Sequence, residues 1–305
     1  MAASPAGGGG ATCLRRLSPA ARARVLLFLA AALFGLLAVL ARIASIEGLT
    51  APQVATVRFA VGTGISLLLF RIRPGTFRPV RKGLLVTRGV LGGLAALLYF
   101  YALALIPAGQ ATLLNNTFPV IAVAISYFTL GERPTWHLLL ALAVTSAGVW
   151  LVLGGGQLRF ELGFGQWVGI ASAFLGAGAV TSIRALRATD NAATIFFAFT
   201  LGGLIVSAPL SIGTWSFHHH AWIFAVAAGA VSFLAQLSMT EAYGALTVAE
   251  AAVWQQLTPV ASFLWAGAVL GEGLSTVGVI GVALGIAGVV YGSILGHRPP
   301  EPEEA

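Results

Sequence analysis

The chain has 305 residues, of which 58% are hydrophobic and only 9% are charged. Soluble domains carry about 25% charged residues, so this chain has more apolar surface than a water-soluble core can bury, and the lipid bilayer is its expected partner. The single cysteine, Cys13, excludes a disulfide framework and a cysteine metal site. The formal charge of +7 does not indicate nucleic acid, because the arginines stand between apolar segments and not on one basic face.

Apolar segments long enough to cross a membrane follow one another along the chain. A helix needs about 20 mostly apolar residues to span a bilayer core, and backbone groups in lipid are satisfied by forming helices. The sequence therefore predicts an all-α membrane protein. Its ten expected transmembrane helices are Val25–Ala44, Pro52–Phe70, Gly83–Ile106, Ala111–Leu130, Trp136–Leu153, Trp167–Ile183, Ala192–Ile212, Ala221–Tyr243, Val248–Leu270 and Leu274–Ile294.

The second half of the chain repeats the first at a constant offset of 140 positions. Pro119 recurs as Pro259, Phe59 recurs as Phe199, and the tripeptide Leu-Gly-Glu that ends at Glu132 recurs at Glu272. Each unit holds five spans, an odd number, so the second unit enters the membrane from the opposite side, as in secondary transporters with inverted repeats. We expect a disordered cytoplasmic tail (1–22), a first repeat (23–153), an external linker (154–166), a second repeat (167–294) and a cytoplasmic tail (295–305).

The basic residues fix the expected orientation. Loops on the cytoplasmic side of membrane proteins are enriched in Lys and Arg. If the N-terminus is cytoplasmic, every Lys and Arg outside the spans lies on that side except Arg42 and Arg159. We therefore predict a multi-pass protein of the cytoplasmic (inner) cell membrane with both termini in the cytoplasm.

Polar side chains inside the second and third spans are the first candidates for a substrate site, because such groups are costly in lipid. Arg58 lies about two turns inside the outer boundary, where snorkelling is difficult, and we expect it to face a cavity or an ion-pair partner. Arg88 lies closer to the cytoplasmic boundary and either binds an anionic group or snorkels to the interface. Tyr99 and Tyr101 provide an aromatic surface on the third span.

The fourth and ninth spans carry matching amide pairs ahead of a proline. Asn115, Asn116 and Pro119 correspond at the same offset to Gln255, Gln256 and Pro259. Each proline frees a backbone carbonyl and kinks a helix, so we expect these spans to line a central cavity. The alternative is that the amides only tie helices together. With Gln236 of the eighth span and Trp254 of the ninth, the predicted substrate contacts are Arg58, Tyr99, Tyr101, Asn115, Asn116, Gln236, Trp254, Gln255 and Gln256.

Two carboxylates near the eighth and ninth spans are candidates for proton coupling. Glu241 ends the eighth span and Glu250 begins the ninth. Two carboxylates close together disfavour simultaneous ionisation, so one of them could carry a proton. The alternative is that Glu250 simply favours the positive end of its helix.

Other motifs are expected to be structural. Gly131 and Gly271 should each end a helix, with Glu132 and Glu272 near the N-terminus of the helix that follows. Glycines along one face of the last span serve either packing within the bundle or dimerisation, so both a monomer and a homodimer are open. The run His218–His220 lies in an external loop without acidic neighbours, and we expect neither a metal nor a cofactor.

The stretch YFYALALIPAGQATLLNNTFPVIAVAISYFTLGERP, which begins at Tyr99, resembles the signature of EamA-like transporters in the drug/metabolite transporter superfamily. A degenerate copy runs from Met239 to Gly273 and lacks the Arg after Gly-Glu. The resemblance covers nearly the whole chain. It implies ten helices, a central cavity, and a substrate drawn from amino acids, nucleobases, toxic cations or other metabolites.

The sequence bears on three classes of function: a transporter, an enzyme, and a channel or sensor. Lys82 is the only lysine, so no P-loop is present and transport must be driven by a gradient. An intramembrane enzyme is disfavoured, because Asp190 is the only aspartate and no metalloprotease or serine-hydrolase motif occurs. We therefore expect no enzyme but a secondary transporter that exports a small, amino-acid-like or related metabolite by alternating access. The alternative is a passive channel or facilitator, or a membrane sensor.

The predicted topology can be tested with reporter fusions. A reporter fused after Arg298 should give a cytoplasmic signal, and one inserted within Gly154–Gln166 should give an external signal. The expectation follows from the bias of Lys and Arg between the two sides. Signals from the same side would contradict the arrangement of five plus five inverted helices.

Overall fold

All regular structure in the described part of the chain is helical. The computed structural model describes residues 17–106, 108–154, 163–213, 215, 219–271 and 275–296. Within these ranges, nine helical segments are long and apolar enough to cross a membrane. The chain is therefore a multi-pass helical membrane protein, as its composition predicts. Most of the predicted tails and of the linker, together with His218 and Glu272, lies outside the described residues.

The helices agree with the predicted spans to within a few residues at most ends, and the fourth and ninth spans are each divided in two. The first half contains α2 (Pro19–Ile46), α3 (Ala51–Ile72), α4 (Lys82–Leu105), α5 (Ala108–Asn115), α6 (Phe118–Leu130) and α7 (Trp136–Gly154). The second half contains α8 (Phe164–Leu186), α9 (Ala192–Ser211), α10 (His219–Ala242), α11 (Val248–Gln255), α12 (Leu257–Leu270) and α13 (Thr276–Leu295).

Two helices begin earlier than expected. α2 starts at Pro19, inside the segment predicted to be a tail, because the Ser18 hydroxyl accepts a hydrogen bond from the Ala21 amide at 3.2 Å and proline suits a first helical turn. α8 starts at Phe164, inside the predicted linker, where the Gln166 side chain accepts a hydrogen bond from the Gly163 amide. Both corrections come from capping groups that stand just outside the apolar runs.

The breaks in the fourth and ninth spans follow from proline chemistry. Pro119 and Pro259 lack the amide hydrogen that would bond to the carbonyls four residues earlier, those of Asn115 and Gln255. α5 ends at Asn115 and α11 ends at Gln255. The fourth span therefore breaks for two residues, Asn116 and Thr117, and the ninth for one, Gln256, while Thr117 and Gln256 keep right-handed helical backbone angles. Each break includes the second amide of its pair.

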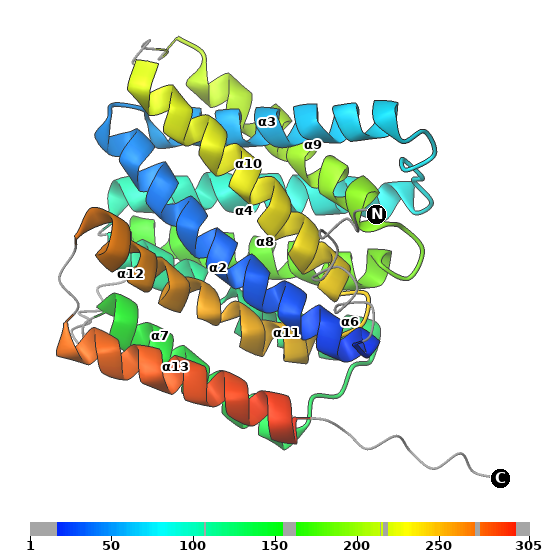
Figure 1. Ribbon diagram of the computed structural model, residues 1–305, viewed down its shortest axis with the longest axis vertical. Helices are drawn as coiled ribbons and strands as arrows, with labels where there is room; N and C mark the ends of the chain where they lie inside the picture. Colours follow the sequence, from blue (N-terminus) through cyan, green and yellow to red (C-terminus); the bar gives the residue numbers. More distant parts are fainter. Residues whose placement is uncertain are drawn as a thin grey trace, which may run out of the picture.

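The helices lie side by side in one bundle, and several pair across the two halves (Figure 1). α2 packs against α10, α4 against α8, α3 against α9, and α7 against α13. In Figure 1 the start of α2 and the end of α13 lie at the same end of the bundle.

Glycine allows the closest of these contacts. A Cβ on Gly148 of α7 would lie 2.6 Å from the Gly281 carbonyl oxygen of α13, so only glycine fits at that crossing. The predicted glycine face of the last span is buried, and it consists of Gly278, Gly281, Gly285, Gly288 and Gly292. Of the two interpretations, this face therefore serves packing within the bundle.

Candidate functional site

The first broken helix brings its amide pair to two different partners. The Asn115 side chain donates a hydrogen bond to the Ser172 hydroxyl of α8 at 2.9 Å. Asn116 donates at 2.9 Å to the Thr112 carbonyl of its own helix. Asn115 therefore ties the break to the other repeat, whereas the hydrogen bond of the Asn116 amide stays within the first repeat.

The second broken helix is buried more deeply. Gln255 donates to the Tyr243 hydroxyl, and Gln256 donates to the Ser146 hydroxyl of α7 at 2.9 Å. The Gln256 side chain is 1% exposed, and its carbonyl oxygen has no hydrogen-bond partner among the described residues. A buried acceptor of this kind is costly unless a ligand or water satisfies it, so Gln256 is the strongest substrate candidate of the four amides.

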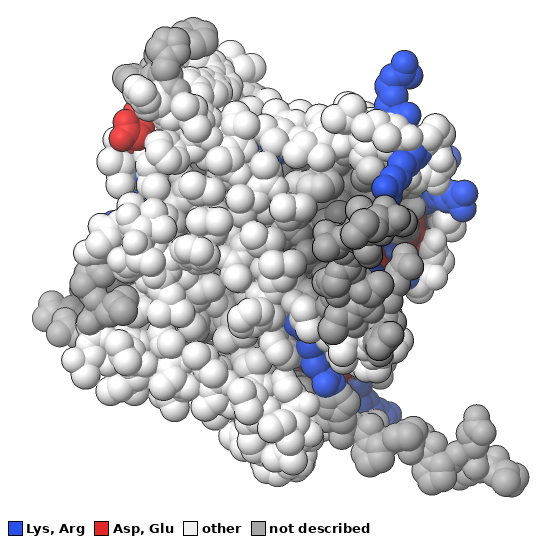
Figure 2. All heavy atoms as spheres, viewed as in Figure 1, with Lys and Arg blue, Asp and Glu red and all other residues white. Residues whose placement is uncertain are grey.

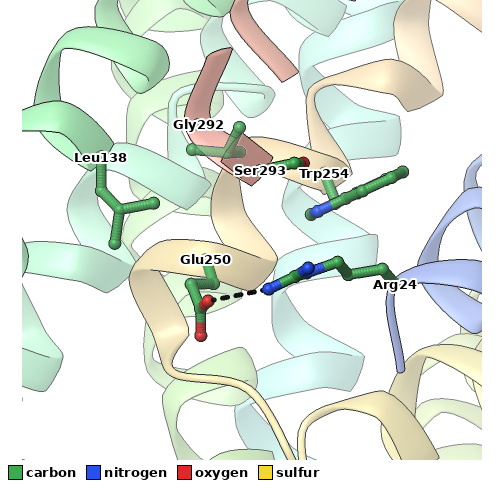
Figure 3. Close-up of a pocket in the computed structure, with 7 residues that line it drawn as sticks. Arg24, Leu138, Glu250, Trp254, Gly292 and Ser293 are labelled. Atoms are coloured by element: carbon green, nitrogen blue, oxygen red, sulfur yellow. Dashed lines mark ion pairs between the residues drawn. The ribbon is translucent and has the colours of Figure 1, made fainter. Parts of the chain in front are cut away.

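Glu250 and Trp254 share one face of α11, as their spacing predicts, and line a narrow hollow with residues of α2, α7 and α13 (Figure 3). Glu250 lies 3.8 Å from the Arg24 guanidinium. It also forms a capping box with Thr247, whose hydroxyl accepts from the Glu250 amide at 3.2 Å. This geometry agrees with the alternative in which Glu250 stabilises the start of its helix.

Glu241 contacts a separate arginine. Its carboxylate lies 3.1 Å from Arg187 of α8. Glu241 and Glu250 therefore each face a guanidinium, and the shared-proton argument loses its main physical cause. Proton coupling through either residue stays a prediction.

Glu132 has a different partner from the one expected. It was predicted to stabilise the helix that follows, α7, but one carboxylate oxygen accepts from the Val248 amide at the start of α11 at 2.7 Å. The other oxygen accepts from Arg184 of α8, also at 2.7 Å. The left-handed Gly131 (φ 67°) ends α6 and turns the chain so that Glu132 reaches across to the second half. The expectation for Gly131 and Gly271 as helix-ending residues is confirmed.

Asp190 makes another connection between the two halves. Its carboxylate accepts from the Val80 amide at 2.8 Å and the Arg81 amide at 3.3 Å, in the loop between α3 and α4. These bonds lie at the end of the bundle where Lys and Arg side chains gather on the surface (Figure 2). We call this the arginine-rich end. It comprises the start of α2, the α3–α4, α6–α7, α8–α9 and α10–α11 connections and the end of α13.

The polar stripe of α10 faces the interior. Ser232, Gln236, Thr240 and Tyr243 are all buried. The Arg58 Nε donates to the Ser232 hydroxyl at 2.7 Å, and the Thr240 hydroxyl has no partner. The structure thus brings Arg58 and the stripe that contains Gln236 together between α3 and α10.

A cavity of about 250 Å³ lies between α3, α4 and α9, away from the arginine-rich end. The start of α3 and the later parts of α4 and α9 line it, and Phe59, Tyr101 and Ser207 are among its residues. The Ser207 hydroxyl is buried without a hydrogen-bond partner. Tyr101 therefore faces this cavity, whereas Tyr99 shares a hydrogen bond with the Thr112 hydroxyl at 2.9 Å.

Arg88 does not snorkel. A Cβ placed on Gly92 would overlap its guanidinium, so the side chain extends along α4 away from the arginine-rich end, although side chains normally tilt toward the helix N-terminus. Arg88 is 3% exposed, and within the part of the chain that the structure describes its Nε has no hydrogen-bond partner. Its guanidinium carbon lies 4.1 Å from the Phe199 ring centroid. A desolvated cation–π contact is worth about 2 kcal/mol, less than the several kcal/mol that burial of an ion costs.

Sequence reasoning missed three of these features. Asp190 had a usable signal, because a lone aspartate between two spans has few roles other than capping. Glu132 had no local signal, because its partner Val248 is 116 residues away. The direction of Arg88 depends on the space above Gly92 and on Phe199, neither of which can be inferred from the third span alone.

Comparison with known proteins gives a consistent family match. The model of the EamA-like transporter family matches the chain twice, over residues 22–154 and 158–293. The pseudopaline exporter CntI of Pseudomonas aeruginosa strain UCBPP-PA14 is 31% identical over 209 residues, which cover 64% of this chain and 69% of that protein.

Two further proteins are similar. A probable terminal-alkyne amino-acid exporter of Streptantibioticus cattleyicolor is 28% identical over 197 residues, which cover 61% of this chain and 64% of that protein. A solved crystal structure superposes with a TM-score of 0.79 at 22% identity, over 92% of this chain and 99% of the other. This last match shows that the two chains share a fold.

Proposed function

The chain belongs to the EamA-like transporter family, and from this premise we propose that it is a secondary transporter that exports a small organic metabolite across the cytoplasmic membrane by alternating access. The names of its relatives, a pseudopaline exporter and a probable amino-acid exporter, support an amino-acid-like or related substrate. They also favour a transporter over an enzyme.

The observation that carries the proposal is the pair of interrupted helices. The fourth span is broken at Asn116–Thr117, between α5 and α6, and the ninth span is broken at Gln256, between α11 and α12. In secondary transporters, discontinuous helices place free backbone groups and helix ends at the substrate site. The buried, unpartnered carbonyl of Gln256 supports this role, because a substrate donor would satisfy it.

The helix pairings support ten membrane-spanning helices in two inverted repeats. The offset of 140 relates α2 to α8 and α4 to α10, and the two contacts α2–α10 and α4–α8 are therefore equivalent. The pairs α3–α9 and α7–α13 each join a helix to its own counterpart. This is the pattern expected when a two-fold axis relates the halves, and five helices per half then require opposite directions in the membrane.

The distribution of ion pairs supports closure at one end. At the arginine-rich end, Arg24–Glu250 and Arg184–Glu132 join the first half to the second. The cavity beside Tyr101 lies toward the opposite end. We infer that this arrangement is closed toward the cytoplasm, and that the ion pairs must separate before substrate enters from inside.

Counterflow distinguishes a carrier from a passive channel or a sensor. A carrier accumulates labelled substrate when unlabelled substrate is present on the other side, because each binding site exchanges one for the other. Counterflow with a panel of free amino acids in proteoliposomes tests the proposal. Saturable, trans-stimulated uptake of at least one compound supports a carrier, whereas flux that stays linear in concentration supports a channel.

Glu250→Gln tests the coupling hypothesis in the same vesicles. If Glu250 carries the coupling proton, the amide should preserve exchange of substrate for substrate and abolish the response to an imposed pH gradient. A variant that still accumulates substrate on that gradient would leave Glu250 with its capping role alone. Glu241→Gln is tested in the same way as the second coupling candidate, and Glu47→Gln, which removes an exposed carboxylate just after α2, is the control.

The amides can be separated from packing residues by comparing activity with stability. We expect Asn116→Ala and Gln256→Ala each to lower transport about tenfold or more, because leaving a bound polar group unpaired costs about 1–3 kcal/mol. Their effect on melting temperature should be small, since hydrogen bonds between membrane helices average about 0.6 kcal/mol. Asn115→Ala, which removes the tie to Ser172, is the packing control. Loss of stability in proportion to lost activity would assign the amides to packing.

A further inference from the structure

The interior of the bundle contains a cation without a counter-ion. Arg88 is 3% exposed, and no carboxylate within the described ranges forms an ion pair with it. Of the described acidic residues, Glu132, Glu241 and Glu250 are each paired with a different arginine at the arginine-rich end, and Asp190 accepts from backbone amides of the α3–α4 loop. A buried charge normally persists only when it is paired, so a bound anion is the partner that Arg88 lacks.

A second arginine stands beside the same aromatic pair. Arg58, from α3, lies next to Phe59, and Arg88 lies next to Phe199, whose ring contacts that of Phe59 edge to face. Arg58 lies 5.4 Å from the Phe59 ring centroid, and Arg88 lies 4.1 Å from that of Phe199. Two like charges repel each other, and an anion near both would relieve the repulsion and supply hydrogen-bond acceptors for their guanidinium donors.

The cavity reaches almost to this pair. Phe59 forms part of its lining, and the Phe59 ring meets the Phe199 ring edge to face at a centroid distance of 5.3 Å. Arg88 lies against Phe199, so the two phenyl rings separate its guanidinium from the cavity. The cavity itself is mostly apolar and holds about 250 Å³. A ligand with a compact apolar body and one negatively charged group matches these surroundings.

We infer that Arg88, assisted by Arg58, is the binding site for a carboxylate of the transported metabolite. This inference rests on the proposed export function and narrows it to substrates that carry an anionic group. Arg88 holds the carboxylate, Arg58 adds a second positive charge, and the apolar cavity takes the remainder of the molecule. Phe199 occupies the face of Arg88 while the site is empty.

Two substitutions distinguish a binding role from a structural one. Arg88→Met keeps the length of the side chain and removes the unpaired charge. Without ligand, the melting temperature of Arg88→Met in detergent should therefore be about 2–4 °C above that of the parent chain. The reason is that a buried charge retained for binding lowers the stability of the empty protein. Arg73→Gln removes an exposed arginine from the end of α3 and should leave the melting temperature unchanged.

The ligand arm uses matched pairs that differ in charge and not in shape. Benzoate is compared with benzamide, and L-leucine with L-leucinamide, at constant ionic strength. The carboxylates should raise the melting temperature of the parent chain and of Arg73→Gln, and the amides should not. The shift should be reduced in Arg58→Gln and absent in Arg88→Met.

The inference would be wrong if empty Arg88→Met melts below the parent chain, or if the amides raise the melting temperature as much as the carboxylates do. It would also be wrong if carboxylates still raise the melting temperature of Arg88→Met, or if only inorganic phosphate or phosphatidylglycerol stabilises the parent chain. Counterflow on the same variants separates this inference from the export function. Counterflow that persists in Arg88→Met would contradict carboxylate binding at Arg88 and leave the export function standing. A rise in melting temperature with carboxylates, without counterflow by the parent chain, would contradict the export function and leave the binding site standing.

Discussion

Inside a bilayer there is no water to satisfy a carbonyl or a charge, so each polar group must find its partner within the protein. This chain obeys the constraint along most of its length through uninterrupted helices, and departs from it in two related places. Pro119 and Pro259 each remove a backbone donor, and the helices stop at Asn115 and Gln255. Side-chain amides lie at both breaks, where they can replace the lost backbone hydrogen bonds or bind a substrate.

The same constraint explains where the charges lie. The described carboxylates at the arginine-rich end are bound by arginines or backbone amides, and two of the ion pairs cross between the halves. Glu132 is the clearest example, since it meets both Arg184 and the first amide of α11. Contacts of this kind link the two halves, and ion pairs near water contribute only about 0–1 kcal/mol each, so these links can be broken at low cost. Among the described residues, neither Arg58 nor Arg88 forms an ion pair, and Arg88, which is 3% exposed, is the more informative of the two.

Much of the fold could be predicted because it depends on local sequence. Apolar run length located the spans, and the recurrence of Pro119 as Pro259 revealed the duplication. The candidate site was predicted less completely. Gln236, Gln255 and Gln256 are buried, and Asn115 and Asn116 are half-buried. The partners of Asn115 and Gln256, Ser172 and Ser146, lie on helices far away in sequence. The roles of Glu132 and Arg88 depend on which helices become neighbours, and hydropathy carries no information about that choice.

Alternating access requires that the two ends of the bundle open in turn. Thiol labelling tests it most directly, because Cys13 is the only native cysteine and can be replaced by serine. Ser207→Cys would report on the cavity, and Thr240→Cys on the buried stripe near the arginine-rich end. Glu132→Gln removes the ion pair with Arg184 at the arginine-rich end. It should raise the reactivity of Thr240→Cys toward an impermeant reagent added on the arginine-rich side, and it should lower the reactivity of Ser207→Cys toward the same reagent added on the opposite side. If both reactivities rise together, the pathway opens at both ends at once, and alternating access is contradicted.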